Sequence, residues 1–272
     1  KTAYEIRPRD WSSDVCSSDL GLLVVLLPLA AVQVFVGRTS AVIKVLYGYA
    51  AVAMLAGIGV SMSRGGWMAA AIVLTLMMAW LLRRRQHRIP AILASVILMG
   101  SGWYYFTRFE TARGRLQGAV VEGSIHSGHS RQYLMGPTLR MWLDHPGLGA
   151  GPGQFDALFP RYRPPTLQLA PGHAHNDYLE LLAEHGIVGA VIIAVGLGIL
   201  GWGVWRTSRF VERGVKELGF KPSNRTAYFV GASLGVSGYL VHCGVEFLFR
   251  IPGVTLAMLL VSATLASNIR FA

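Results

Sequence analysis

The sequence has few charged residues and few cysteines. Asp, Glu, Lys and Arg make up 14% of its 272 residues, whereas soluble domains carry about 25%. Together with a hydrophobic content of 53%, this deficit excludes both a soluble globule and a disordered chain. The two cysteines, Cys16 and Cys243, are too few for a disulfide scaffold. We therefore expect a membrane protein.

The net charge of +11 is concentrated at the ends of long apolar runs. A basic protein can bind nucleic acid, but positive charge in this position is typical of membrane topology. We therefore expect a polytopic protein whose partners include membrane lipids and no nucleic acid.

Residues 1–20 differ from everything that follows, because they are polar, rich in Ser and Asp, and without periodicity. Reverse translation of Lys1 to Ile6 and of Asp10 to Leu20 gives codons that resemble a widely used sequencing adapter. We therefore interpret residues 1–20 as adapter-derived rather than native, and leave them out of the fold prediction. On this interpretation Cys243 has no disulfide partner, and we expect natural N-terminal helices to be missing.

Long apolar runs predict the membrane spans, since a spanning helix needs about 20 mostly apolar residues. Seven runs reach this length or come close to it: 20–37, 41–60, 66–82, 90–107, 187–205, 227–249 and 252–269. The predicted fold is an all-α, polytopic membrane helix bundle, with four spans in residues 21–107 and three in residues 187–272.

Basic clusters predict the orientation of these spans, because short cytoplasmic loops are rich in Lys and Arg. The turn 83–88 carries four arginines, and the connection 206–226 carries six basic residues against two acidic ones. With both on the cytoplasmic side, alternation leaves residues 108–186 outside as one long extracytoplasmic loop with short helices. Loops of this length are usually functional. Arg64 and Arg250 fall on the same outer side.

The first part of the long loop has two arginines on a predicted amphipathic helix, 131–143. Arg131 and Arg140 are nine positions apart, which is about 180° around a regular helix. They can face one ligand only if Gly136-Pro137 bends the helix. Either arginine alone can instead contact lipid headgroups or solvent.

A glycine-rich stretch, 145–155, follows this helix. Its alternating glycines permit a close approach of the backbone, and its N–H groups could cradle a phosphate. A tight turn is the alternative, because the stretch lacks the spacing of a P-loop or of a dinucleotide-binding loop.

The segment 173–186 combines a histidine with several carboxylates. Asn176 or Asp177 can cap a helix that runs toward the next span. On that helix Asp177, Glu180 and Glu184 would form one polar stripe. His175 lies at the start of the helix, at the outer surface of the bilayer.

Three interpretations of His175 compete. With His173 and Asp177 it has the atoms of a metal site, although the spacing matches no HExxH motif and no cysteine pair is present. It can be a structural histidine that caps the helix. It can also be a general base at an interfacial active site, since an imidazole can take a proton from a hydroxyl near neutral pH.

A second ionisable pair lies in the sixth predicted span. His242 and Glu246 are four residues apart in its outer half and would share one helix face. Ionisable residues inside a membrane are often functional. A structural pair between helices is the alternative that we favour.

Three stretches of the chain together match one family pattern. They are Ser63-Arg64-Gly65-Gly66; the group Ser130-Arg131, Trp142, His145-Pro146 and 149–155; and His175-Asn176 followed, after nine residues, by Gly186-Ile187-Val188-Gly189. These motifs resemble the signature of the O-antigen ligase/polymerase family over about residues 40–205. Ala190 stands where the family usually has Thr or Val.

The resemblance implies a GT-C-like, multi-spanning glycosyltransferase that acts at the outer face of a bacterial inner membrane. Its donor would be a glycan on undecaprenyl diphosphate. The acceptor would be the lipid A-core sugar of lipopolysaccharide in a ligase, a growing surface glycan in a polymerase, or a protein hydroxyl. The resemblance implies neither a nucleotide sugar nor an obligatory metal, so we expect no cofactor.

The resemblance also implies roles for particular residues. Arg64 and Arg131 would bind the donor diphosphate, which suits a guanidinium because it binds phosphate through two parallel hydrogen bonds. His175 would be the general base on the acceptor hydroxyl or a partner of the leaving group, with Arg140 and Arg250 as secondary candidates. A permease or a lipid-linked glycan flippase is the alternative from another class, but it would favour internal repeats and broken helices at the midplane.

Overall fold

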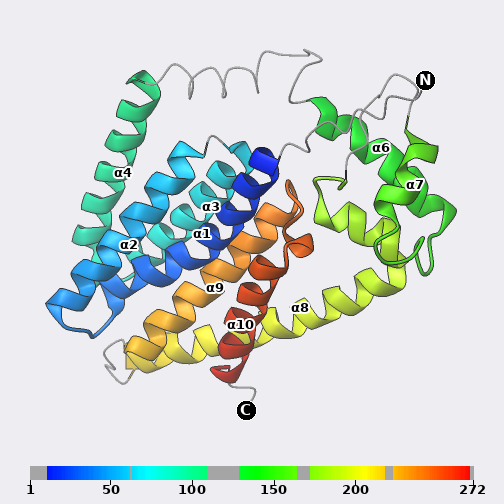
Figure 1. The fold of residues 1–272 in the computed structure, drawn as a ribbon. Coiled ribbons are helices and arrows are strands. Elements are labelled where there is room, and N and C mark those ends of the chain that lie inside the picture. The colour runs from blue at the N-terminus through cyan, green and yellow to red at the C-terminus, as the bar shows by residue number, and fades with distance from the viewer. Residues whose placement is uncertain (1–10, 62, 109–128, 164–171, 218–222, 270–272) are drawn as a thin grey trace.

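Figure 1 shows the computed structural model of the chain, which describes residues 11–61, 63–108, 129–163, 172–217 and 223–269. These ranges contain helices and no strand, which confirms the predicted all-α fold. In chain order the helices are α1 (Trp11–Val36), α2 (Ala41–Val60), α3 (Arg64–Leu82), η1 (Arg85–His87), α4 (Arg88–Arg108), α6 (His129–Asp144), α7 (Phe155–Tyr162), α8 (Asp177–Glu217), α9 (Asn224–Cys243), η2 (Leu248–Arg250) and α10 (Pro252–Ser267).

Each of the seven predicted spans falls on a helix, but α1, α8 and α9 have other ends than the predicted runs. α8 begins at Asp177 and continues to Glu217, beyond both ends of 187–205. α1 begins at Trp11 rather than at residue 20, so it extends into the segment that was left out of the fold prediction. α9 ends at Cys243, and residues 244–249 lie outside it. Hydropathy alone misses the end of α9, because the apolar run continues to Phe249.

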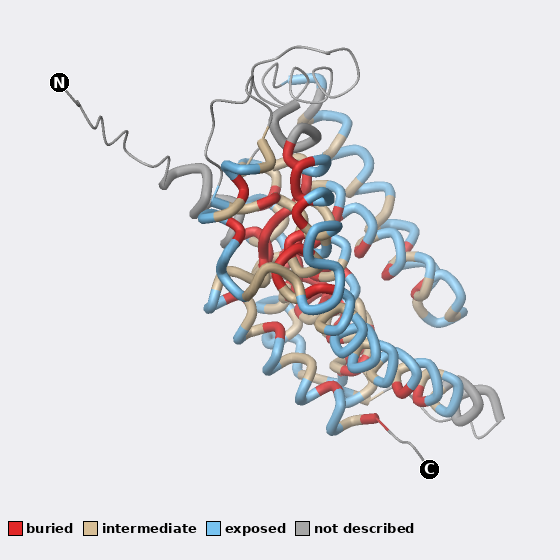
Figure 2. Tube along the Cα trace, turned by 90° about the vertical axis from the view of Figure 1, so that its right-hand side faces the viewer, coloured by how far each residue is buried: buried red, intermediate tan, exposed pale blue. Residues whose placement is uncertain are grey.

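Three helices of the described ranges are long and apolar enough to cross a membrane: Ala41–Val60, Arg64–Leu82 and Asp177–Val211. Two shorter apolar helices, Leu20–Val36 and Pro252–Ser267, accompany them. Large apolar side chains on α2 and α8, such as Val45 and Ile192, point away from the core, and much of α8 is exposed along its length (Figure 2). Exposed apolar surface of this extent marks a membrane contact.

α1 and α9 form the centre of the bundle. A methyl group at Gly231 of α9 would lie 2.8 Å from Cα of Leu29, and one at Gly235 would lie 2.5 Å from the carbonyl oxygen of Val25. Small residues at helical spacing allow two helices to approach this closely. Buried aliphatic residues of α2 and α3 cover another side of α1, while α10 packs with α9.

Hydrogen bonds join the turns at each end of the bundle. At one end, the backbone N–H of Arg38 donates to Oδ1 of Asn224. At the other end of α2, the hydroxyl of Tyr105 donates to the carbonyl of Gly59 at 3.2 Å. The connection at Arg38 and the connection before Asn224, both predicted to be cytoplasmic, therefore lie at one end of the bundle. The ends of α2 and α4, both predicted to be outside, lie at the other end. The predicted alternation of spans requires this arrangement.

A smaller helical unit packs on the first turns of α8. It has its own core, formed by Leu134, Met141, Phe155, Phe159, Ala174 and Ala183. Figure 1 shows α6 and α7 beside the start of α8, at the edge of the bundle. The described helices of segment 108–186, α6 and α7, therefore pack against the first turns of α8.

Candidate functional site

Asn176 caps α8 and fixes the position of the residue before it. Its Oδ1 accepts hydrogen bonds from the backbone N–H groups of Tyr178 and Leu179, both at 3.1 Å, as predicted for an N-cap. His175 precedes it with a φ of +51°. Among the described residues, no other non-glycine residue has a positive φ. A non-glycine residue keeps such a backbone only where its surroundings hold it, often at a functional site.

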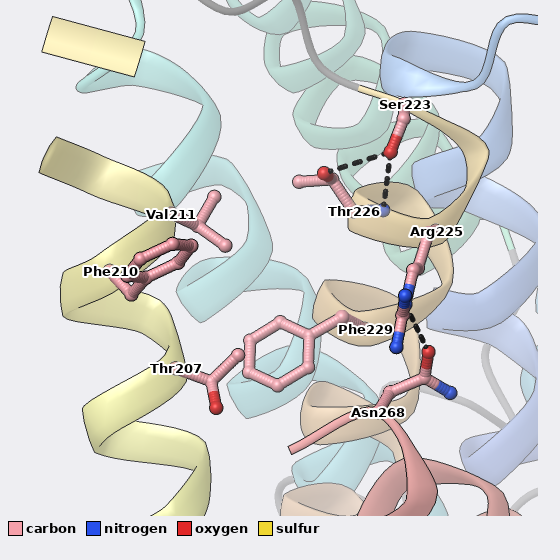
Figure 3. Close-up of a pocket in the computed structure, with 8 residues that line it drawn as sticks. All are labelled: Thr207, Phe210, Val211, Ser223, Arg225, Thr226, Phe229 and Asn268. Atoms are coloured by element: carbon pink, nitrogen blue, oxygen red, sulfur yellow. Dashed lines mark hydrogen bonds between the residues drawn. The ribbon is translucent and has the colours of Figure 1, made fainter. Parts of the chain in front are cut away.

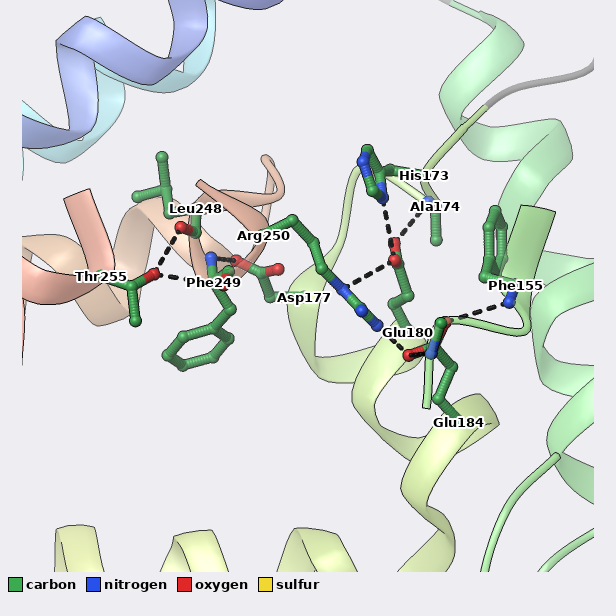
Figure 4. Close-up of polar contacts among 11 residues, drawn as sticks. Phe155, His173, Ala174, Asp177, Glu180, Glu184, Leu248, Phe249, Arg250 and Thr255 are labelled. Carbon is green, nitrogen blue, oxygen red and sulfur yellow. Dashed lines mark hydrogen bonds and ion pairs between the residues drawn. The ribbon is translucent and has the colours of Figure 1, made fainter. Parts of the chain in front are cut away.

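The acidic stripe predicted for α8 is present, and its three side chains are buried. Asp177, Glu180 and Glu184 are only 1–2% exposed. A buried carboxylate is costly unless it is hydrogen-bonded or paired with a cation. All three have such partners, which come from segments far apart in the sequence (Figure 4).

Glu180 holds the residues in front of His175. Its Oε2 accepts a hydrogen bond from the backbone N–H of Ala174 at 2.8 Å, and its Oε1 lies 3.0 Å from Nδ1 of His173. The same Oε1 lies 3.1 Å from Nε of Arg250. Glu180 therefore joins the entry to α8 with the turn between α9 and α10.

Glu184 joins the glycine-rich stretch to the same arginine. It accepts hydrogen bonds from the backbone N–H groups of Gly153 and Phe155, both at 3.0 Å, and Arg250 donates to its Oε2. Burial alone would lower the pKa of Arg250, but the hydrogen bond to Glu184 and the charge of Glu180 outweigh it and raise that pKa. The structure thus places this secondary diphosphate candidate in an internal ion-pair network.

Asp177 binds the segment that follows α9. Its Oδ2 accepts a hydrogen bond from the backbone N–H of Phe249 at 3.0 Å. The hydroxyl of Thr255 lies 3.1 Å from the carbonyl oxygens of both Leu248 and Phe249. The backbone at Leu248 and Phe249 therefore bonds to α8 and α10, and residues 244–250 form a turn that faces the start of α8. We call this segment the 244–250 turn.

α8 is bent at Gly186, where φ is +63° and ψ is −168°. The N–H groups just after the bend find partners in the glycine-rich stretch: Ile187 donates to the carbonyl of Pro146 at 2.9 Å, and Val188 to that of Gly147 at 3.2 Å. The bend separates the first turns of α8 from the long apolar part of the helix.

The N–H groups of the glycine-rich stretch turn toward α8 in return. Ala150 donates to the carbonyl of Ala183 at 2.9 Å, and Gly151 to that of Glu184 at 3.0 Å. A methyl group at Gly149 would overlap the backbone of Glu184. The phosphate-cradle interpretation is therefore wrong for these N–H groups, because carbonyl oxygens of α8 already accept their hydrogen bonds. The glycines instead allow the backbone of the stretch to approach the backbone of α8.

The imidazole of His175 lies between the 244–250 turn and the surface. Its Nδ1 is 3.3 Å from Oε2 of Glu246, and its ring meets that of Phe247 edge-on with 5.0 Å between centroids. The side chain of His175 is 26% exposed, whereas that of Glu246 is 2% exposed. One edge of the imidazole is therefore held by the protein while part of the ring remains accessible.

The three side chains considered for a metal site have different partners. His173 contacts Glu180, His175 contacts Glu246, and Asp177 accepts from the backbone of the 244–250 turn. Among the described residues, no three His, Cys, Asp or Glu side chains come together as metal ligands do. The geometry of this segment favours hydrogen bonding over coordination.

Arg64 is the first residue of α3 and lies at the same end of the bundle. A methyl group at the neighbouring Gly65 would be 2.9 Å from Cγ2 of Val245 and 3.4 Å from Nε2 of His242. The start of α3 therefore packs against the 244–250 turn, which also contacts His175. Two residues that are 111 positions apart in the sequence thus flank one turn.

The two arginines of α6 are related by a continuous helix. α6 runs from His129 to Asp144 and contains Pro137 within it. Arg140 is exposed. Arg131 lies near the start of α6, and its side chain is outside the described residues.

His242 and Glu246 do not lie on one helix as predicted, because α9 ends between them at Cys243. His242 is buried within α9, and Glu246 is buried in the 244–250 turn. The carboxylate of Glu246 contacts His175. Sequence reasoning missed this partnership, since the two residues are 71 positions apart.

A small cavity of about 120 Å³ lies at the other end of the bundle (Figure 3). Its lining consists of Thr207, Phe210, Val211, Ser223, Arg225, Thr226, Phe229 and Asn268. Arg225 is the charged residue of this lining, and its Nε donates to Oδ1 of Asn268 at 2.7 Å. The lining has no acid or base that could move a proton, whereas the start of α8, near Asp177, has several.

These features define a helical membrane protein in which ionisable residues from separate segments gather at one end of the bundle. The chain belongs to the O-antigen ligase family, whose family model matches residues 49–194, more than half of the chain. This match confirms the resemblance indicated by the motifs. A search of curated proteins gives no match.

Membership in this family indicates a function of the lipid-linked glycan ligase or polymerase kind, performed by a glycosyltransferase-like membrane protein. The matched residues include Arg64, Arg131 and His175, and they end before Glu246 and Arg250. Two of the groups that organise the candidate site thus come from beyond the matched part of the chain.

Proposed function

We propose that the protein transfers a glycan from undecaprenyl diphosphate to an acceptor hydroxyl at the outer face of a bacterial inner membrane. The observation that carries the proposal is the placement of His175, partly exposed and within the family match, at the same end of the bundle as Arg64. The acceptor is lipid A-core sugar, a growing surface glycan or a protein hydroxyl. The permease or flippase alternative receives no support from the family match.

In the proposed reaction the imidazole of His175 takes the proton of the acceptor hydroxyl. The hydroxyl oxygen bonds to the anomeric carbon of the donor glycan as the bond from that carbon to the diphosphate oxygen breaks. The electron pair of the broken bond stays on undecaprenyl diphosphate, where Arg64 and Arg131 stabilise the added charge. Proton transfer of this kind contributes about 10²–10⁴-fold, and preorganised cationic groups stabilise developing charge most strongly where water is excluded.

The proposed topology follows from the same assignment. Four spans in residues 21–107 and three in residues 187–272 enclose one extracytoplasmic segment, 108–186, which carries Arg131 and His175. The hydrogen bonds that join turns at each end of the bundle support this alternation.

We expect His175→Ala to lower the rate of glycan transfer about 10²–10⁴-fold, because it removes the proposed proton acceptor. Arg64→Ala should lower it about 10²–10³-fold, because it removes one charge from the diphosphate site. The measurement is transfer from an undecaprenyl-diphosphate glycan by the full-length protein in liposomes.

The matched control for these variants is Arg161→Ala, which removes an exposed arginine of α7. It should transfer glycan at nearly the wild-type rate, so that a loss in Arg64→Ala reflects the position of the charge. Near wild-type transfer by both His175→Ala and Arg64→Ala would contradict the proposed roles.

The proposed topology predicts that cysteines at positions 64 and 175 react with a membrane-impermeant thiol reagent from the outside only. A cysteine in place of Gln86, an exposed residue of η1, should react only after the membrane is opened. The background should carry Cys16→Ser and Cys243→Ser, so that the introduced cysteine is the reactive thiol of the chain. Labelling of positions 64 and 175 from opposite sides would exclude a shared site.

A further inference from the structure

We infer that Glu246 is a positioning residue for His175, which orients the imidazole and stabilises its protonated form during transfer. The inference rests on the proposed function, because it assigns a partner to the proposed general base. Its direct observation is the 3.3 Å contact between Oε2 of Glu246 and Nδ1 of His175.

The chemistry of the contact defines which nitrogen is free to react. An ionised carboxylate can only accept hydrogen bonds, so Nδ1 of His175 carries the hydrogen in this pair. The other ring nitrogen, Nε2, is then unprotonated and able to take a proton. A base that is oriented by a third group is the general arrangement for activating a hydroxyl.

The surroundings hold both members of the pair in place. On one side, Glu180 binds the backbone of Ala174 and Asn176 caps α8, so the strained backbone of His175 is fixed before and after it. On the other side, Glu246 is buried and adjacent to Phe247, whose ring packs against the imidazole. Low exposure strengthens the interaction between a carboxylate and an imidazolium.

The 244–250 turn that carries Glu246 is itself tied to α8. Asp177 accepts from the backbone of Phe249, and Arg250 pairs with Glu180 and Glu184. These contacts hold the 244–250 turn, which lies beyond the family-matched residues, on the start of α8.

The test is Glu246→Gln, which preserves the shape of the side chain and removes its charge. We expect kcat to fall at least about tenfold, as for the loss of a partner that orients a functional histidine, with KM nearly unchanged. We also expect the acidic limb of the kcat–pH profile to move to lower pH, because loss of the carboxylate destabilises the imidazolium. The other ionisable groups on the neighbouring elements stay unchanged: Arg64, His173, Asp177, Glu180, His242 and Arg250.

Two further variants separate positioning from structure. Glu184→Gln makes the same substitution in the same network away from His175, and should lower the unfolding midpoint without moving the pH profile. In a His175→Ala background, Glu246→Gln should change the remaining rate by less than about twofold, because residues that act as a unit are not additive. If Glu246→Gln does not fold, Glu246→Asp is the variant to measure. Because it keeps the charge, we expect a smaller loss of kcat and an unchanged pH profile.

The outcomes distinguish this inference from the proposed function. A folded Glu246→Gln variant with wild-type kcat and pH profile, beside an inactive His175→Ala variant, would overturn the inference alone. An equal shift of the pH profile in Glu184→Gln would overturn it too, because the effect would then not depend on the contact. Full activity of His175→Ala would instead remove the proposed function.

Discussion

Gly186→Ala is expected to destabilise the folded protein strongly. The backbone at Gly186, with φ of +63° and ψ of −168°, lies in a region that is open essentially to glycine alone, and strain there costs about 1–3 kcal/mol. The new methyl group would also overlap the carbonyl oxygen of Gly147. That oxygen cannot withdraw freely, because it accepts the hydrogen bond of Val188.

We therefore expect Gly186→Ala to cost at least about 3 kcal/mol, which combines the upper value for backbone strain with the steric overlap. The apparent Tm in detergent should fall by about 10 °C. Gly196→Ala is the matched control, because Gly196 lies in the same helix with no atom within 4 Å of a new methyl group. Alanine favours a helix by up to about 1 kcal/mol over glycine, so this control should melt at or above the wild-type temperature. Equal melting of both variants would contradict the role assigned to the bend.

Arg250→Met is expected to cost about 3–5 kcal/mol, the penalty for removing one partner of a buried ion pair. Arg250 contacts both Glu180 and Glu184, and these carboxylates are 1% exposed. Methionine keeps much of the apolar stem and removes the charge. Two neighbouring carboxylates are then left without their shared cation, which destabilises the folded state.

The pH dependence of the wild-type protein follows from the raised pKa of Arg250. A raised pKa means that the folded state holds the proton more tightly than the unfolded state, so the stabilisation is complete below the unfolded-state pKa. It is lost only as the pH rises through the folded-state value. The ion pair should therefore persist throughout the neutral and mildly basic range.

The measurement for Arg250→Met is equilibrium or thermal unfolding at neutral pH. Adding Glu180→Gln and Glu184→Gln should restore part of the loss, because neutral side chains no longer need the cation. Arg161→Met, at an exposed position of α7, should change stability by less than about 0.5 kcal/mol. A triple variant no more stable than Arg250→Met would show that the lost charge is not the cause.

The helices were predictable because the signals for them are local. Apolar runs long enough to span a membrane are read directly from neighbouring residues, and each predicted run falls on a helix. The cap at Asn176 and the acidic stripe after it also follow from local spacing. The end of α9 was not predictable from hydropathy, because the apolar run continues past Cys243 to Phe249, whose backbone N–H binds Asp177 rather than a helix carbonyl.

The candidate site was predictable only in part. The spacing around His175 and the serine–arginine motif at Arg64 indicated the family, and the family match confirms that inference. The prediction that the glycine-rich stretch allows a close approach of the backbone was correct. The group that its N–H groups bind is the backbone of α8 rather than a phosphate. Arg250, a secondary candidate for the site, proved to be the partner of two buried carboxylates.

The sequence by itself determined the all-helical class, the family, and the residue types that gather near His175, because each depends on composition or short spacing. Only the tertiary structure decided which carboxylate meets which base. Partners such as Glu246 and His175 are 71 residues apart, and Glu246 lies in a turn whose backbone is bound by Asp177. Contacts of this range arise from packing of the whole chain, and no local pattern of apolar and polar residues encodes them.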